Sequence, residues 1–283
     1  MSAMLQRLSL GMLLLCALSA AAACEWPGWQ QYKQYYISPQ GRVIDPSSPN
    51  KITTSEGQSY GLFFALVADI PGLGLMLLPG KVGFVAEDRW RLNPSYLPPQ
   101  LLTRFAALNG PWRAMRQVNQ RLWLETAPHG FSPDWVVWLV GAGWQPDTVK
   151  PNVGSYDAIR VYLWAGMLAD DDEHKAALLK RFQPMAQLTA SQGVPPEKTD
   201  TASGKTTGDG PVGFSAAMLP MLATQAEALA TQRQRISEHP PGDDAYFSAS
   251  LTLFGQGWDQ QRYRFNRQGE LQPSWDGQCT TSK

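Results

Sequence analysis

The sequence has few cysteines, few histidines and no excess of charge, and these scarcities exclude several classes of function. Lysine plus arginine equals aspartate plus glutamate at 24 each, so the chain has no basic field that would attract a nucleic acid. Three histidines, His129, His174 and His239, stand far apart with no cysteine pair nearby, which leaves no case for zinc. We therefore expect no metal, no cofactor and no nucleic-acid partner. A neutral polymer is the easier substrate to imagine.

Long hydrophobic runs are missing except at the start of the chain. There, Arg7 precedes the apolar stretch Leu8–Leu18 and the small residues Ala20-Ala21-Ala22, a pattern typical of an export signal and too short to span a bilayer convincingly. With 43% hydrophobic residues the remainder can bury a large core. We expect a signal peptide over residues 1–22 and one globular domain over 23–283, with no membrane span in the mature chain and a periplasmic or secreted location.

Of the three cysteines, Cys16 lies within the expected signal peptide and Cys24 and Cys279 lie outside it. In an oxidising compartment such a pair favours a disulfide that joins the two ends of the mature chain. The alternative is lipidation of Cys24, but the leucine that usually stands three residues before a lipidated cysteine is missing. We favour the disulfide.

What the sequence does have is a series of helical patterns separated by loops rich in glycine and proline. These features indicate an all-α fold. Strand-like stretches are short, over 135–144 and over 262–271 with a turn at 267–269. The helical patterns cover 100–108, 111–126, 155–168, 174–190, 214–236 with a break near Pro220, and 243–254.

One carboxyl group stands among hydroxyls at the start of an apolar helical pattern. Thr53 and Glu56 are three residues apart, which matches a capping box at the start of the helix that runs through Leu62–Leu66. The same placement could present Glu56 as a catalytic acid. Spacing alone favours the cap.

Several motifs shift that balance, because together they resemble the family 8 glycoside hydrolases, and most closely the endoglucanases of this family that accompany bacterial cellulose synthase. The resemblance covers nearly the whole mature chain. It rests on Lys51–Phe64, Pro71–Gly74, Leu77–Phe84, Asn93–Pro99, Phe131–Trp135, Ser155–Arg160, Gly210–Ser215 and Leu253–Asp259.

The resemblance implies an endo-1,4-β-glucanase (a cellulase) that cleaves cellulose with inversion, on a barrel of paired helices, (α/α)6, with the substrate groove at one end. It implies that Glu56 is the general acid and Asp157 the general base. If Ser155 caps the following helix, Asp157 falls in its first turn, near Arg160. Among the many aromatic residues, Tyr96 and Tyr156 are expected to line the groove, and Arg160 to position Asp157 or a sugar hydroxyl.

Trp90 and Trp135 are weaker candidates for the groove. The expected partners are cellulose or β-1,4-glucan oligomers and the cellulose synthase complex, near which the enzyme would trim nascent cellulose.

One departure from the family concerns the segment after Asp69. In the family, a helical block with an Ala-Ser-Asp-Gly-Asp motif separates the Glu helix from the Pro-Gly-Leu-Gly segment, whereas here Ala68-Asp69 runs straight into Ile70-Pro71. We therefore expect an incomplete barrel that lacks a third active-site carboxylate, and strongly reduced turnover. The alternative function is a catalytically impaired, glucan-binding remnant of such an enzyme.

Overall fold

The computed structural model describes residues 34–39, 44, 67–80, 83–108, 110–242 and 245–274. The chain divides into two compact units, residues 1–64 and 65–283. In the first unit, the backbone N–H of Ile44 donates to the carbonyl oxygen of Tyr36 at 2.8 Å. The expected signal peptide, both cysteines of the expected disulfide and Glu56 lie outside the described residues.

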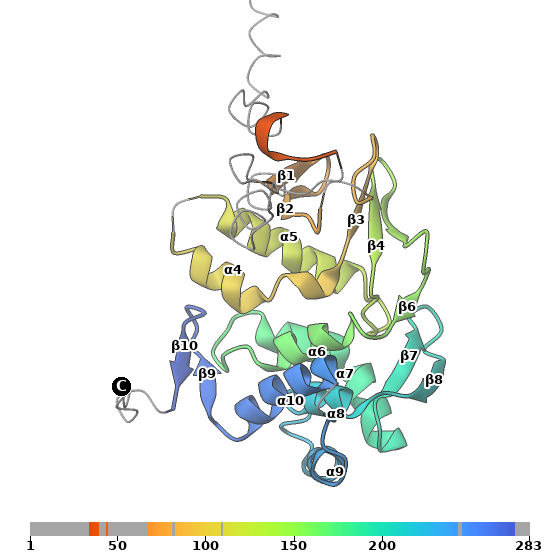
Figure 1. The fold of residues 1–283 in the computed structure, drawn as a ribbon, viewed down its shortest axis with the longest axis vertical. Coiled ribbons are helices and arrows are strands. Elements are labelled where there is room, and N and C mark those ends of the chain that lie inside the picture. The colour runs from red at the N-terminus through yellow and green to blue at the C-terminus, as the bar shows by residue number, and fades with distance from the viewer. Residues whose placement is uncertain are drawn as a thin grey trace, which may run out of the picture. The chain divides into compact units, whose positions relative to one another are not determined.

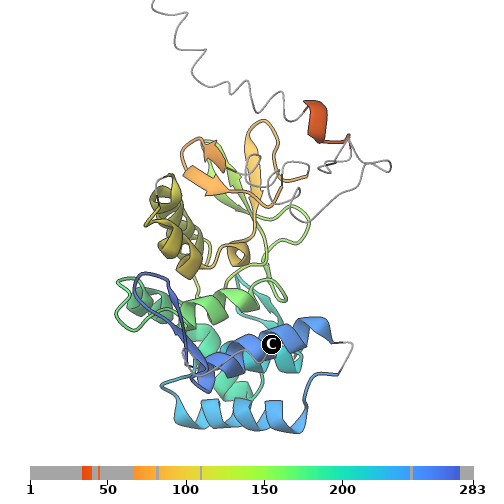
Figure 2. The ribbon, with the colours of Figure 1, turned by 60° about the vertical axis from the view of Figure 1, so that its left-hand side comes forward.

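Helices form the larger part of the regular secondary structure described in the second unit. They lie within or close to the predicted segments, and the predicted break near Pro220 is confirmed, since it separates two helices. Figures 1 and 2 show two groups of helices. The helices Pro99–Phe105 and Trp112–Glu125 pack as a pair, and the other helices form the second group. The helices are α4 (Pro99–Phe105), α5 (Trp112–Glu125), α6 (Ile159–Gly166), α7 (Lys175–Gln192), α8 (Val212–Met218), α9 (Ala226–Glu238) and α10 (Tyr246–Asp259), preceded by the 3-10 turn η2 (Pro94–Tyr96).

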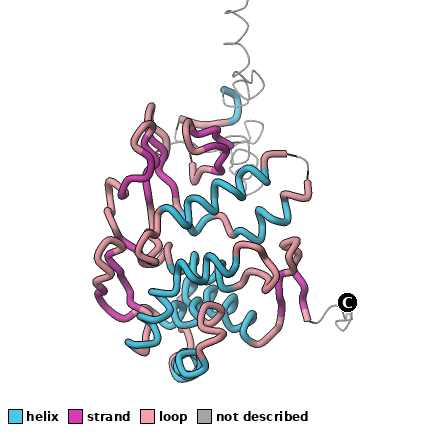
Figure 3. The backbone as a smooth tube through the Cα atoms, turned by 180° about the vertical axis from the view of Figure 1, so that it is seen from behind, coloured by secondary structure: helices cyan, strands magenta, loops and turns pink. Residues whose placement is uncertain are grey.

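Short strands form four small antiparallel sheets, so the all-α prediction is only partly right. Both predicted strand regions are confirmed as hairpins, but the other strands were missed. Figure 3 shows the strands in magenta at the margins of the helices. The sheets are β1 (Val67–Ile70) with β2 (Gly74–Leu77); β3 (Arg89–Leu92), β4 (Val136–Leu139) and β5 (Gly143–Pro146); β6 (Val153–Gly154), β7 (Pro196–Asp200) and β8 (Thr206–Asp209); and β9 (Tyr263–Phe265) with β10 (Leu271–Pro273).

The β1–β2 hairpin and its turn contain residues 68–71, where the sequence is expected to depart from the family. The predicted helix ran through Leu62–Leu66, which lie outside the described residues, but the chain is extended from Val67 onward. Gly72 has φ +77° in the connecting turn, a conformation that favours glycine. Ala68 and Asp69 therefore belong to a tight hairpin and not to a continued helix.

The core of the second unit lies between α5, α6, α7 and α8, where Trp123, Tyr162, Phe182 and Phe214 are almost fully buried. Two of these rings also use their polar atoms to hold loops. The indole N–H of Trp123 donates to the carbonyl oxygen of Pro94 at 2.7 Å, and the hydroxyl oxygen of Tyr162 accepts from the backbone N–H of Ser132 at 2.8 Å. The core thus positions η2 and the segment before β4, which carry the candidate site.

Among the helices of the described ranges, none combines the length and the apolar character needed to cross a bilayer.

Candidate active site

Asp157 lies in the turn that leads into α6, and its carboxylate accepts two side-chain hydrogen bonds. The indole N–H of Trp135 donates to Oδ2 at 3.0 Å, and Nη2 of Arg160 donates to Oδ1 at 2.5 Å. About a quarter of the Asp157 side chain, 26%, remains exposed. A carboxylate held in this way has a fixed direction and still reaches solvent, which suits a group that takes a proton from water.

A buried carboxyl group organises the turn around Asp157. Oδ1 of Asp134 accepts the backbone N–H groups of Ser155, Asp157 and Ala158 at 2.7, 3.1 and 2.8 Å. Burial raises the pKa of Asp134, and the charge of Asp157 raises it further, while these hydrogen bonds oppose the shift. The backbone that presents Asp157 is therefore held from inside the protein.

The expectation that Ser155 caps the helix is wrong. Its hydroxyl donates instead to the carbonyl oxygen of Glu197 at 2.6 Å, and the residue before the first turn of α6 is Ala158, which makes no side-chain cap. Asp134 caps this turn instead, because one oxygen of its carboxyl group accepts from three backbone N–H groups at once.

Arg160 connects Asp157 to the segment before α4. Its guanidinium donates from Nη2 and Nε to Oγ of Ser95 at 2.8 and 3.2 Å, in addition to its bond with Asp157. Ser95 in turn donates through Oγ to Oδ1 of Asn93 at 2.7 Å. Arg160 is thus shared between two segments and fixed in direction, as expected for a group that positions Asp157.

Tyr96 and Trp135 border Asp157 with aromatic surface. Their rings meet edge to face with centres 5.5 Å apart, and Cζ of Arg160 lies 5.7 Å from the centre of the Tyr96 ring. Tyr96 is 49% exposed. Burial, followed by the nearby charge of Asp157, raises the pKa of its hydroxyl. The structure therefore brings Tyr96, Asp157 and Arg160 together.

Trp135 is held from other directions as well. Phe84 stacks on its ring with centres 5.6 Å apart, and Cζ of Arg91 lies 4.1 Å from the ring centre. Arg91 is itself fixed by two hydrogen bonds to the buried carboxylate of Asp147, at 2.6 and 3.0 Å. The indole N–H that points at Asp157 is consequently well positioned.

Tyr156 is adjacent to Asp157 in the sequence but contacts other groups. Its hydroxyl donates to Oε1 of Glu197 at 3.3 Å, and its ring packs edge to face on Phe214 and tilted against Phe247. Its pKa is raised by burial and by the charge of Glu197. Tyr156 is 43% exposed. Its expected contact with a substrate stays a prediction.

Glu56 and Trp90 are two further candidates from the sequence. Glu56 lies outside the described residues. Trp90 lies in β3 opposite Trp138 of β4 and has no recorded contact with Asp157. Among the described residues, no group of three or more histidine, cysteine, aspartate or glutamate side chains could hold a metal ion.

Sequence reasoning missed Asp134 and Ser95 as parts of the site and gave Trp135 little weight. Asp134 precedes Trp135 in a motif that was already singled out, so this pair was the available signal. Its partners lie 21 to 24 residues further along the chain, and Ser95 is 65 residues from Arg160. Neither contact follows from local spacing.

Comparisons with known proteins agree with these motifs. The sequence profile described as "Glycosyl hydrolases family 8" matches residues 2–71 and 67–261. An endoglucanase of Escherichia coli O157:H7 is 45% identical over 358 aligned positions, covering 96% of this chain and 97% of the relative. An endoglucanase of Xanthomonas axonopodis pv. citri is 38% identical, covering 92% of each chain.

A solved structure of similar fold is the endo-1,4-D-glucanase of Vibrio fischeri. It is 33% identical, with a TM-score of 0.68, covering 89% of this chain and 100% of that one. With a family profile that spans most of the sequence, these matches show that the chain belongs to family 8 of the glycosyl hydrolases.

Proposed function

We propose that the protein is an endo-1,4-β-glucanase that hydrolyses the β-1,4-glucosidic bonds of cellulose. The similar proteins named above are endoglucanases, and one is named for the 1,4 linkage. The observation that carries the proposal to the level of residues is the geometry of Asp157, a partly exposed carboxylate fixed by Trp135 and Arg160.

The proposed mechanism is inversion with two carboxyl groups. Asp157 takes a proton from a water molecule while the oxygen of that water bonds to the anomeric carbon, and the glycosidic bond breaks. Glu56 donates its proton to the departing sugar oxygen. Inverting enzymes hold the two carboxyl groups about 6.5–9.5 Å apart to leave room for the water. Arg160 positions Asp157, and we assign Tyr96 and Tyr156 to the walls of the groove.

The rival proposal is a catalytically impaired remnant that binds glucan without cleaving it. The alignment with the Escherichia coli relative spans 358 positions, more than the 283 residues of this chain, so the relative has residues that this chain lacks. The family profile also matches in two parts that meet at residues 67–71. These findings support the proposed internal deletion after Asp69, and with it an incomplete (α/α)6 barrel and the loss of an active-site carboxylate.

We further propose that residues 1–22 are a signal peptide and that residues 23–283 form one catalytic domain in the periplasm or outside the cell. The proposed role is to trim nascent cellulose, with the cellulose synthase complex as a partner. Both proposals rest on the sequence motifs described above.

The test is hydrolysis of carboxymethyl cellulose, followed by the loss of viscosity and the release of reducing ends. Glu56→Gln and Asp157→Asn are the informative variants, and Asp171→Asn, which changes an exposed acid, is the matched control. Activity that both site variants abolish supports the enzyme. A folded chain that binds cello-oligosaccharides and releases no reducing ends establishes the remnant.

A further inference from the structure

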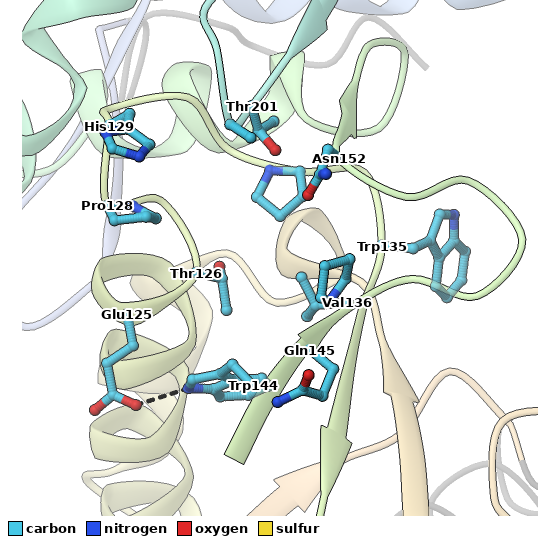
Figure 4. Close-up of a pocket in the computed structure, with 13 residues that line it drawn as sticks. Glu125, Thr126, Pro128, His129, Trp135, Val136, Trp144, Gln145, Asn152 and Thr201 are labelled. Atoms are coloured by element: carbon cyan, nitrogen blue, oxygen red, sulfur yellow. Dashed lines mark hydrogen bonds between the residues drawn. The ribbon is translucent and has the colours of Figure 1, made fainter. Parts of the chain in front are cut away.

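A hollow of about 210 Å³ lies between the end of α5, the β4–β5 hairpin and the turn after β7. We name it the hairpin pocket. Trp135 is one of its lining residues, but Figure 4 shows the Trp135 ring directed away from the hollow, so the indole N–H that donates to Asp157 lies outside it. Its volume is below the roughly 300 Å³ at which pockets for drug-sized ligands begin. A single small ring is therefore a better fit than a larger ligand.

Trp144 supplies a rigid aromatic surface to the hairpin pocket. Its indole N–H donates to Oε2 of Glu125 at 2.7 Å, drawn as a dashed line in Figure 4. Its ring also packs edge to face on Trp138, with centres 4.9 Å apart. The indole is only partly buried, so ring surface remains available to a ligand. Because both contacts hold the ring in place, little side-chain entropy remains to be lost when a ligand stacks on it.

Thr201 supplies a hydroxyl group that has no partner among the described residues. The residue is only 7% exposed, it lines the hairpin pocket, and Figure 4 shows its oxygen directed into the hollow. Its backbone is fixed, since the N–H donates to the carbonyl oxygen of Asn152 at 2.8 Å. The hydroxyl oxygen is therefore open to the hollow and free to bond to a polar ligand there.

Other hydrogen-bonding groups surround the same space. The side-chain amide of Asn152 and the imidazole of His129 line the hairpin pocket, and neither has a recorded hydrogen bond to another described side chain. The amide of Gln145 uses its nitrogen to donate to the carbonyl oxygen of Ala142 at 3.1 Å, which leaves its oxygen available. Donors and acceptors are thus both present around one aromatic face.

The charges around the hairpin pocket disfavour an anionic ligand. Glu125 is the acid that lines it, and Arg121, which could have attracted an anion, is engaged by both oxygens of Glu125 and by the carbonyl oxygen of Leu73. Burial alone would raise the pKa of Glu125, but hydrogen bonds from Arg121 and Trp144 outweigh it and lower the pKa. The carboxylate is therefore an acceptor at neutral pH, suited to hydroxyl donors.

We propose that the hairpin pocket binds one glucosyl unit of a β-1,4-glucan strand, outside the catalytic groove. The apolar face of the sugar ring stacks on Trp144, and its hydroxyls bond to Thr201, Asn152 and Glu125. The choice of glucose rests on the proposed function. The class of ligand, a neutral ring with many hydroxyls, rests on the pocket itself.

The test is calorimetric titration of the full chain with cellopentaose. Asp157→Asn is introduced throughout so that binding is measured without cleavage. Trp144→Ala removes the stacking surface and is expected to weaken binding at this site at least about tenfold. Thr201→Val keeps the shape and removes one hydroxyl, and it is expected to weaken binding about threefold to tenfold. Trp112→Ala, which removes a partly buried indole from the start of α5, is the control and is expected to bind as the parent does.

Melting curves identify any variant that fails to fold, and Thr201→Val then decides alone. Parent affinity in a folded Thr201→Val overturns the inference, and so does a parent that binds no cellopentaose. Hydrolysis of carboxymethyl cellulose by the chain with Asp157 intact is scored separately. If Thr201→Val weakens binding but the chain with Asp157 intact hydrolyses nothing, the pocket is supported and the proposed enzyme activity is not. If the chain with Asp157 intact hydrolyses the substrate but Thr201→Val binds as the parent does, the enzyme activity is supported and the pocket is not.

Discussion

The turn that holds Asp157 and the contact between α8 and α10 are stabilised in opposite ways. The turn depends on directed polar contacts from Asp134, Trp135 and Arg160. In the helix contact, by contrast, a Cβ built at Gly255 would overlap the carbonyl oxygen of Ala216, so the two backbones approach as closely as glycine permits. The first region can lose a group and keep its fold, whereas the second has no room to adjust. Function and stability should therefore respond to different substitutions.

The largest effect is expected at Asp157. Asp157→Asn keeps the size of the side chain and removes the proposed base, so we expect kcat on cellulose oligomers to fall about a thousandfold, with the melting temperature little changed. Reducing-end assays and melting curves measure the two quantities. An Asp157→Asn chain that unfolds readily would show that this region is also structural.

Gly255→Ala is expected to be the most damaging change in the packed region. The added methyl group must push α8 and α10 apart, and overpacking of this kind costs about 3 kcal/mol of unfolding free energy. Urea denaturation of the variant measures that loss. Ser250→Ala, on the exposed side of α10, is the matched control and should change stability by less than about 0.5 kcal/mol. Equal effects in the two variants would contradict the close contact.

Asp134 offers a way to separate shape from charge in the turn. Asp134→Ala leaves three backbone N–H groups without an acceptor, and we expect a loss of about 2 kcal/mol together with reduced kcat. Asp134→Asn retains one acceptor oxygen, so its stability should stay within about 1 kcal/mol of the parent. If both variants lose the same stability, the three hydrogen bonds are not the reason that Asp134 matters.

The smallest expected effect is a dependence of stability on pH through Asp147. Hydrogen bonds from Arg91 and from backbone N–H groups outweigh the effect of burial and lower the pKa of Asp147 in the folded state. A lowered pKa stabilises the fold above the unfolded value of about 3.9. That contribution, about 1 kcal/mol, disappears as the pH falls through the folded value. As the pH is lowered from about 6 to about 3, across that unfolded pKa, the melting temperature should therefore fall less steeply for Asp147→Asn than for the parent.

The helices were predictable because their signals are local. In α5 the apolar spacing and the proline at its start, Pro111, coincide with the observed helix, and the turn over 267–269 lies within the β9–β10 hairpin. β7 and β8 were missed because their residues, Pro196–Asp200 and Thr206–Asp209, include few apolar positions to alternate. Their pairing is decided by tertiary contacts, as strand formation often is.

Within the site, contacts between residues close in the sequence were predictable. Contacts between residues from distant segments were not. Asp157 and Arg160 are three residues apart and meet as expected. Asp134 and Ser95 act on them from distant segments, and no spacing rule connects them. Tyr156 shows the converse, since its position beside Asp157 in the sequence does not give it contact with the carboxylate.

The segment 93–97 is held by two helices, α5 and α6. Its carbonyl oxygens accept from Trp123 and Asn119 on α5 and from Trp164 on α6, and Arg160 of α6 donates to Ser95. The direction of Asp157 therefore depends on the α4–α5 pair staying docked on the other helices. Catalytic activity therefore reports whether the two groups of helices remain docked. On heating, catalysis should fade before the far-ultraviolet signal of the helices does, because the helices can outlast the contact between them.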